Sequence, residues 1–114
     1  MDIRFHTRGP NTVFALVEHA RRRLEFRLVH RKDRVSHIAV KLGGTGSRRD
    51  HQDTYCVLRV KLRGLPAATV VDVGADDYAT IDRAVDRVGR LAEAQLRRNG
   101  ATQRRSTQLK EMTA

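Results

Sequence analysis

The chain of 114 residues contains one cysteine and no long apolar run. Because Cys56 is the only cysteine, no disulfide can form within one chain, and a zinc site built from cysteines is excluded. No apolar run approaches the roughly 20 residues of a membrane-spanning helix, and the N-terminus lacks the apolar region of a secretory signal. We therefore expect a soluble cytoplasmic protein without a membrane partner.

Sequence signals for a metal, a cofactor or catalysis are also lacking. The five histidines show no i, i+4 spacing or short paired spacing of the kind that metal sites use; they are His6, His19, His30, His37 and His51. Acid/base catalysis needs groups held in a pocket, whereas the aspartates at 72, 76, 77 and 82 fit strand ends, caps and ion pairs. We expect no metal, no cofactor, no small-molecule substrate and no enzymatic activity.

Acidic residues are outnumbered by basic ones. The 23 lysines and arginines exceed the 13 aspartates and glutamates, so the formal net charge is +10 and the pI is about 11.2. Such a balance favours attraction to a polyanion, either nucleic acid or an anionic membrane surface. The length suits one small domain with a modest core.

In the first half of the chain, the spacing of apolar residues predicts a strand, a helix and a second strand. Ile3 and Phe5 alternate with polar residues, which predicts a strand over residues 2–7. Asn11 or Thr12 can cap a helix over residues 13–28, whose apolar positions are Leu16, Val17, Ala20, Leu24 and Leu28. A second strand is predicted over residues 35–42. The glycine cluster at 43–47 precedes Arg48, Arg49 and another strand rather than a helix, which favours a mobile basic hairpin over a phosphate-binding loop.

The second half contains two further strands and a helix. Alternation predicts strands over residues 55–63 and 67–73, with Cys56 in the core. Asp76 or Asp77 can cap a helix from about Tyr78 to Arg98, after which Gly100 ends it. We expect a domain over residues 1–99 and a disordered basic tail over residues 100–114, where arginines 104 and 105 could add weak RNA contact.

The last helix separates its residues by chemistry. At about 100° per residue, one side carries Arg83, Arg87, Arg90, Arg97 and Arg98, and the opposite side carries Ile81, Val85, Val88, Ala92 and Leu96. Asp82, Asp86 and Glu93 form a narrow strip between them. The basic side is either a solvated face or a phosphate-binding surface, since guanidinium donors match phosphate oxygens.

These elements predict an α+β fold: a two-layer sandwich of a four-stranded antiparallel sheet with both helices on one face. The element order is strand, helix, three strands, helix. The open face of the sheet would carry Arg4, His6, His37, Lys41, Arg59, Lys61 and Arg63. Tyr55 and Tyr78 are candidates for stacking on bases, with core or edge packing as the alternative.

Over roughly residues 1–98, the chain resembles the ribosome hibernation-promoting factor family, also called ribosome-associated inhibitor or protein Y, in its short form, and residues 76–90 are the strongest part of the resemblance. The segment has an acidic pair, Tyr78, small residues, Ile81-Asp82, an aliphatic position and the basic spacing Arg87-x-x-Arg90. The first helix is similar at Ala15-Leu16, Glu18 and Arg22-Arg23-Leu24. The chain departs from the family at Thr12-Val13-Phe14 and at Gly89, where a helix-forming residue is usual.

The resemblance implies a non-enzymatic, monomeric protein that binds the small ribosomal subunit and its rRNA. It would occupy the decoding channel, inhibit translation or stabilise idle ribosomes, and act in ribosome hibernation under stress. The resemblance assigns rRNA contacts to Arg22, Arg23, Arg87 and Arg90. With the charge pattern, the candidate RNA-binding residues are Arg22, Arg23, Arg83, Arg87, Arg90, Arg97, Lys41, Arg59 and Lys61.

Two other functions fit the composition. A general double-stranded-RNA-binding module also sets helices against a sheet, although that class typically opens with a helix, whereas this chain opens with a strand. A protein-interaction module could use the basic faces to bind an acidic partner. Comparable affinity for a bare RNA duplex and for ribosomes would favour the RNA-binding module. Ribonuclease-insensitive binding of one acidic protein would favour the protein-interaction module.

Overall fold

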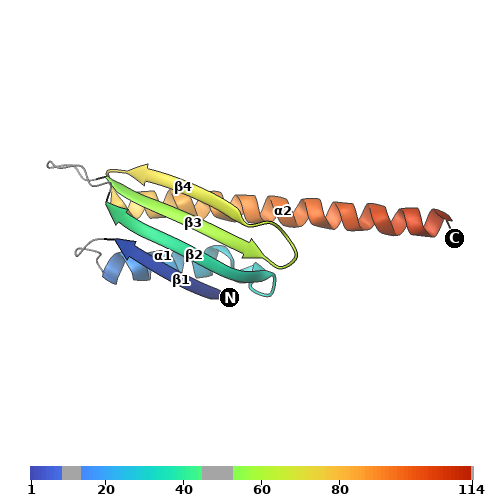
Figure 1. Ribbon diagram of the computed structural model, residues 1–114, viewed down its shortest axis with the longest axis horizontal. Coiled ribbons are helices and arrows are strands. Elements are labelled where there is room, and N and C mark those ends of the chain that lie inside the picture. Colours follow the sequence, from blue (N-terminus) through green and yellow to red (C-terminus); the bar gives the residue numbers. More distant parts are fainter. Residues whose placement is uncertain (9–13, 45–52, 114) are drawn as a thin grey trace.

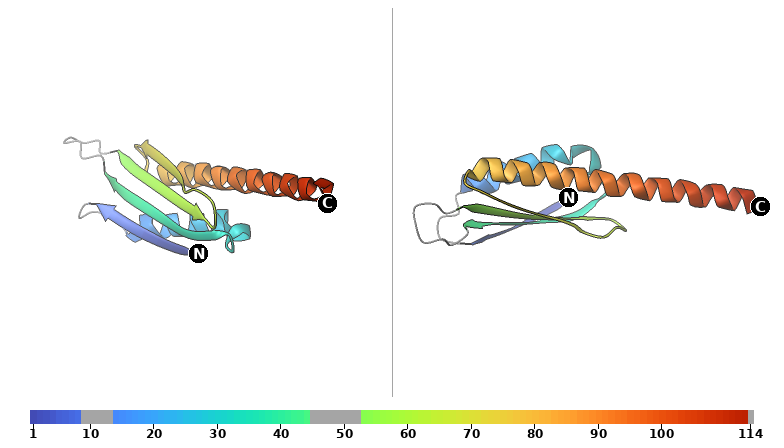
Figure 2. Two further views of the ribbon diagram at one scale, coloured as in Figure 1. Left: turned by 45° about the vertical axis from the view of Figure 1, so that its right-hand side comes forward. Right: turned by 90° about the horizontal axis from the view of Figure 1, so that it is seen from above.

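A computed structural model describes residues 1–8, 14–44 and 53–113, with side chains described up to residue 100. The elements are β1 (Asp2–Arg8), α1 (Phe14–Arg27), the short 3-10 helix η1 (Val29–Arg31), β2 (Val35–Gly44), β3 (Thr54–Leu62), β4 (Ala68–Gly74) and α2 (Asp77–Thr113). One four-stranded sheet has the order β1-β2-β3-β4, and both helices lie on one of its faces (Figures 1 and 2). The predicted α+β sandwich and its element order are confirmed.

The sheet is mixed, so the prediction of an antiparallel sheet is wrong at its first strand. β1 pairs with β2 in parallel, with Asp2 opposite His37 and Arg8 opposite Gly43. The β2–β3 and β3–β4 pairs are antiparallel. The reason is the connection: α1 carries the chain back along one face of the sheet, and such a crossover returns the next strand in the same direction.

The core lies between the sheet and the two helices. Inward positions of β2 and β3 alternate as predicted and are buried, including Cys56, Leu58 and Val60. Facing them are buried residues of both helices, together with Leu28 directly after α1: Ala20, Leu24, Ile81, Ala84, Val85, Val88 and Ala92. Burial of each large aliphatic side chain stabilises the fold by about 1.5–3 kcal/mol. The apolar stripe of each helix is therefore fixed against the sheet, and its polar residues face outward.

Asp76 is the residue that caps α2. The Ala79 amide donates to Asp76 Oδ1 over 2.9 Å, which satisfies one of the free amides of the first turn. The buried Thr80 hydroxyl donates to the Asp76 backbone oxygen over 2.7 Å. Of the two predicted caps, the structure uses the first.

α2 continues beyond its predicted end. Expected to finish near Arg98, it passes through Gly100 and ends at Thr113, so the predicted boundary is wrong. One interior glycine lowers helix stability by about 1 kcal/mol but does not by itself end a helix. The continuation projects past the sheet, and the molecule is 68 Å long (Figure 1).

Two sequence predictions lie outside the described residues: the cap of α1 at Asn11 or Thr12 and the hairpin that follows Gly44. Within the described part of the chain, no helix is long and apolar enough to cross a membrane.

Candidate nucleic-acid interface

The acidic strip of α2 lies against α1. His19 Nε2 pairs with Asp82 Oδ1 at 2.7 Å, and Arg23 Nε lies 3.2 Å from the same oxygen. Further along the seam, Arg27 Nη1 donates to Glu93 Oε1 over 2.7 Å. Asp82 and Glu93 of the strip therefore hold the two helices together.

Ion pairing perturbs the titration of the groups at this seam. The hydrogen bond from Arg27 holds the pKa of Glu93 below its ordinary value, and the same contact raises the pKa of the Arg27 guanidinium. A hydrogen bond from Arg90, four residues further along the helix, lowers the pKa of Asp86. These carboxylates are therefore ionised well into the acid range, where they continue to pair with arginine.

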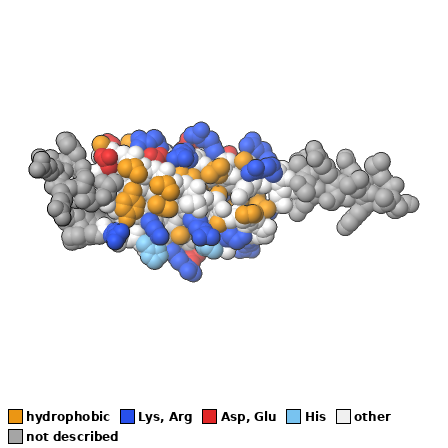
Figure 3. All heavy atoms as spheres, turned by 45° about the horizontal axis from the view of Figure 1, so that its top comes forward, with side chains coloured by type: hydrophobic (Ala, Val, Ile, Leu, Met, Phe, Trp, Pro, Cys, Tyr) orange, Lys and Arg blue, Asp and Glu red, His pale blue; other side chains and the backbone are white. Residues whose placement is uncertain are grey.

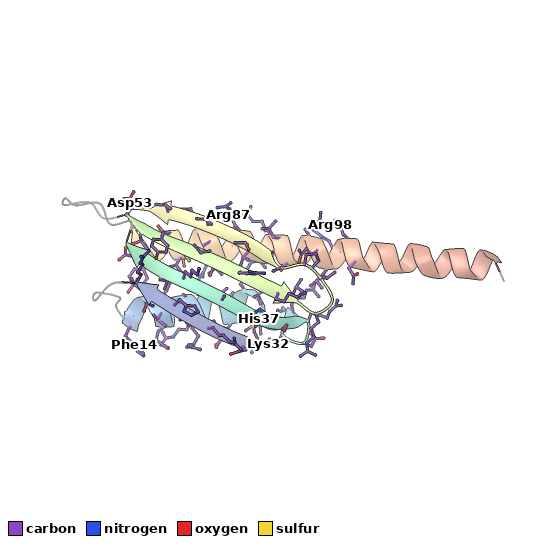
Figure 4. The ribbon with its side chains drawn as sticks, in the orientation of Figure 1. Phe14, Lys32, His37, Asp53, Arg87 and Arg98 are labelled. Carbon is purple, nitrogen blue, oxygen red and sulfur yellow. The ribbon has the colours of Figure 1, made fainter. Side chains whose placement is uncertain are left out.

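Arg83 and Arg87 project from α2 to the free edge of β4. Arg83 Nη2 lies 3.4 Å from Asp72 Oδ1, and Arg87 Nη1 lies 3.7 Å from Asp72 Oδ2. The side chain of Asp72 is only 12% exposed. Arg87 Nη1 also donates to the backbone oxygen of Val71 over 3.1 Å. Figure 4 shows Arg87 beside β4. A guanidinium has five N–H donors, and both side chains stay about half exposed, so donors remain for a ligand.

Four other candidate cations have no ion pair among the described residues: Arg22, Arg97, Lys41 and Arg59. Arg22 lies on the outer side of α1, and Arg97 on the outer side of α2. Lys41 and Arg59 are exposed on the open face of the sheet, opposite the helices. Their charges are available to a polyanion without breaking an internal contact.

Lys61 is less available than predicted. Its Nζ donates to the backbone oxygen of Leu62 over 3.2 Å and also to that of Leu65. These contacts tie the ammonium group to the turn between β3 and β4, where Gly64 adopts a φ of +75° that favours glycine. Lys61 therefore has a local structural role.

An apolar strip crosses the open sheet face between cations. Tyr55 pairs with Val73, and Val57 with Val71, on neighbouring strands. Val71 and Val73 are exposed. Figure 3 shows hydrophobic side chains in the middle of one face, with Lys and Arg along both of its long borders. Of the two tyrosines proposed for stacking, Tyr55 packs over Gly43, and the Tyr78 ring makes an edge contact with His19 at a centroid distance of 4.8 Å.

The structure thus divides the predicted site residues among three regions. Arg22, Arg23, Arg90 and Arg97 lie on the outer side of the helical layer, which we call the helical arginine surface. Arg83 and Arg87 lie at the β4 edge, and Lys41, Arg59 and Lys61 belong to the opposite face. The helical layer and the β4 edge adjoin through α2, whereas the sheet face points the other way.

Sequence reasoning missed Asp72 and Phe26. Asp72 was expected among the strand-end, capping and ion-pairing aspartates, but its position between Arg83 and Arg87 depends on how β4 packs beside α2. Phe26 does not belong to the helically spaced apolar positions of α1, and this mismatch was the one sequence signal that its side chain is exposed. In the described ranges, no three His, Cys, Asp or Glu side chains form a group that could hold a metal ion.

Comparisons with known proteins identify the fold. No protein-family model and no curated protein sequence matches the chain. Among solved structures, the protein Y N-terminal domain of Thermus thermophilus matches with a TM-score of 0.64 and 25% identity, over 80% of this chain and 94% of that chain. This chain has the fold of protein Y. A ribosomal subunit interface protein from Coxiella burnetii matches with a TM-score of 0.65 and 21% identity, over 84% of this chain and 99% of that one.

The predicted resemblance to the hibernation-promoting factor family is confirmed by these two structures. Each match covers at least four fifths of the chain, in keeping with a resemblance expected over roughly residues 1–98. The arginines of α1 and α2 therefore lie on a fold shared with protein Y.

Proposed function

We propose that this chain is a ribosome-associated, non-enzymatic protein of the cytoplasm. It binds the small subunit through rRNA phosphates, occupies the decoding channel as a monomer, and inhibits translation or stabilises idle ribosomes by steric exclusion. The observation that carries the proposal is the match to protein Y and to a ribosomal subunit interface protein, in a chain with a net charge of +10.

The arrangement of charge supports RNA as the ligand. Arg23 and Arg90 are exposed at the seam between the helices, although each has a carboxylate partner, Asp82 and Asp86 respectively. These exposed ion pairs are weak, so a phosphate can replace the carboxylate at low free-energy cost. The pairs hold the guanidinium groups in place before binding, and Arg22 and Arg97, which have no ion pair among the described residues, add charge to the same layer.

Charge reversal at Arg87 and Arg90 tests the proposal. We expect Arg87→Glu with Arg90→Glu to abolish co-sedimentation with purified small subunits, because two attractive phosphate contacts become repulsive. The matched control is Arg4→Glu with Arg63→Glu, which changes the net charge equally at positions outside the proposed set. Equal loss of binding in both variants, or unchanged binding in the first, contradicts the proposal.

The apolar strip of Tyr55, Val57, Val71 and Val73 favours a second candidate, a protein-interaction surface for an acidic partner. An exposed apolar group bordered by charge is typical of a protein contact. If that is the main function, Val71→Ser with Val73→Ser weakens binding to intact small subunits but leaves binding to protein-free rRNA unchanged.

A further inference from the structure

The outer side of α1 exposes an aromatic ring that the fold does not use. Phe26 is 76% exposed. Among the described residues, the aromatic contacts are the edge contact of His19 with Tyr78 and the stacking of Arg21 over Phe5, and Phe26 takes part in neither. A ring so exposed presents an aromatic face on which a flat ligand can stack.

The surroundings of Phe26 define the chemistry of that ligand. Arg22 and Arg23 precede it by four and three residues, which places them beside it on the helix surface. Arg22 has no ion pair in the described chain, and Arg23 is about half exposed beside Asp82. The segment over residues 21–34 is strongly basic, with seven lysines and arginines against two acidic residues, and Arg22 and Arg23 are its members next to Phe26.

We propose that Phe26 is a stacking platform for an unpaired RNA base, and that Arg22 and Arg23 bind the phosphates next to that base. Aromatic rings stack on the face of any base, and neighbouring guanidinium groups match phosphate oxygens. A second copy of the chain does not suit this surface, because two equally basic segments would repel each other. The inference rests on the proposed function in taking RNA as the ligand, and it specifies single-stranded RNA at this position.

The test compares two phenylalanines of the same helix. Phe14 is also 76% exposed, but its neighbour four residues along is Glu18 instead of an arginine, so Phe14→Leu is the matched control for Phe26→Leu. Binding is measured by fluorescence anisotropy with a short unstructured oligoribonucleotide and with an RNA duplex of the same base composition. We expect Phe26→Leu to weaken binding of the single strand roughly fivefold or more, and binding of the duplex very little.

Two further variants separate stacking from charge. Phe26→Trp retains or increases the affinity for the single strand, because it keeps an aromatic face. Arg22→Ala lowers the salt dependence of binding, whereas Phe26→Leu leaves that dependence unchanged. Because Phe26 is exposed, its replacement does not change the thermal unfolding midpoint, which verifies that a weaker complex does not result from misfolding.

Three outcomes overturn the inference: equal binding of the single strand by Phe26→Leu and the unchanged chain, an equal loss for single strand and duplex, or an equal loss in Phe14→Leu. A Phe26→Leu effect seen only in a ribonuclease-resistant complex with a small-subunit protein would identify a protein contact and also overturn it. If Arg87→Glu with Arg90→Glu leaves small-subunit binding intact while Phe26→Leu still weakens single-strand binding, the proposed function fails and the stacking site stands.

Discussion

Arg27 of α1 crosses Gly89 of α2 to reach Glu93. Its Nη1 donates to Glu93 Oε1 over 2.7 Å, and a Cβ on Gly89 would lie only 2.5 Å from Arg27 Nε. The glycine that departs from the helix-forming residue usual in the family therefore makes room for this cross-helix contact. The contact directs Arg27 inward and leaves Arg22 and Arg23 on the outer surface.

The first prediction concerns Gly89→Ala. Alanine favours the helix by about 1 kcal/mol over glycine, but here it displaces Arg27 from Glu93. We expect the substitution to stabilise the protein by about 1 kcal/mol when Arg27→Ala is already present, and to give clearly less stabilisation, or destabilisation, in the unchanged chain. Urea unfolding of the four proteins of the cycle measures the difference. The same free-energy change in both backgrounds would show that Arg27 and Gly89 are not coupled.

The pH dependence of stability tests the contact between Arg27 and Glu93 through the ionisation of Glu93. The hydrogen bond from Arg27 lowers the pKa of Glu93 below its ordinary value of 4.5, so the unfolded chain binds a proton more readily than the folded one. The stabilisation is complete above about pH 4.5 and is lost as the pH falls through the lower folded-state pKa.

We therefore expect Glu93→Gln to reduce the fall in unfolding free energy between pH 6 and pH 3, about the range in which carboxylates titrate. Thermal unfolding across that range checks the slope. Asp33→Asn is the control, since Asp33 has no ion pair within the described chain. An equally steep slope in Glu93→Gln contradicts the assignment.

Cys56 is expected to be inert in the folded protein. Burial, with a smaller effect of the Asp72 charge, raises the pKa of its thiol to about 12, so very little thiolate exists near neutral pH. Alkylation by iodoacetamide, followed by mass spectrometry, is expected to be slow in buffer and fast in denaturant. Rapid alkylation of the native chain would show that β3 is open at this position.

Removal of residues 101–114 tests the domain boundary expected from the sequence. The core cluster and the side chains packed against it run from Ile3 to Leu96, so a chain ending at Gly100 is expected to fold with a similar unfolding midpoint. Its helical circular dichroism should decrease, since α2 loses the turns up to Thr113. A truncated chain that fails to unfold cooperatively would extend the domain into the end of α2.

The sequence predicted the fold where periodicity is tied to burial. Alternation at Cys56, Leu58 and Val60, and helical spacing at Val85 and Val88, assigned the inward positions because a one-residue shift would turn each side chain to the other face. The direction of β1 was missed, since pairing depends on the path of α1 and not on alternation. The end of α2 was missed because one glycine was taken as a stop.

The candidate site was predicted less completely than the fold. Helical geometry gathered Arg83, Arg87 and Arg90 on one side, but pairing with Asp72 and Asp86 depends on tertiary packing and rotamers, which spacing does not specify. The contact of Lys61 with the backbone of its own turn was likewise not visible in the spacing. The RNA contacts of all these residues remain predictions.

The measurement that tests the central claim most directly is competition on purified small subunits. Subunits carrying increasing amounts of mRNA and tRNA are mixed with the labelled chain, and the bound fraction is measured by sedimentation. If the helical arginine surface docks in the decoding channel, the chain excludes mRNA and tRNA from it. The bound fraction of the chain then falls as mRNA and tRNA fill the channel. Simultaneous binding, with undiminished affinity on fully occupied subunits, would contradict the account.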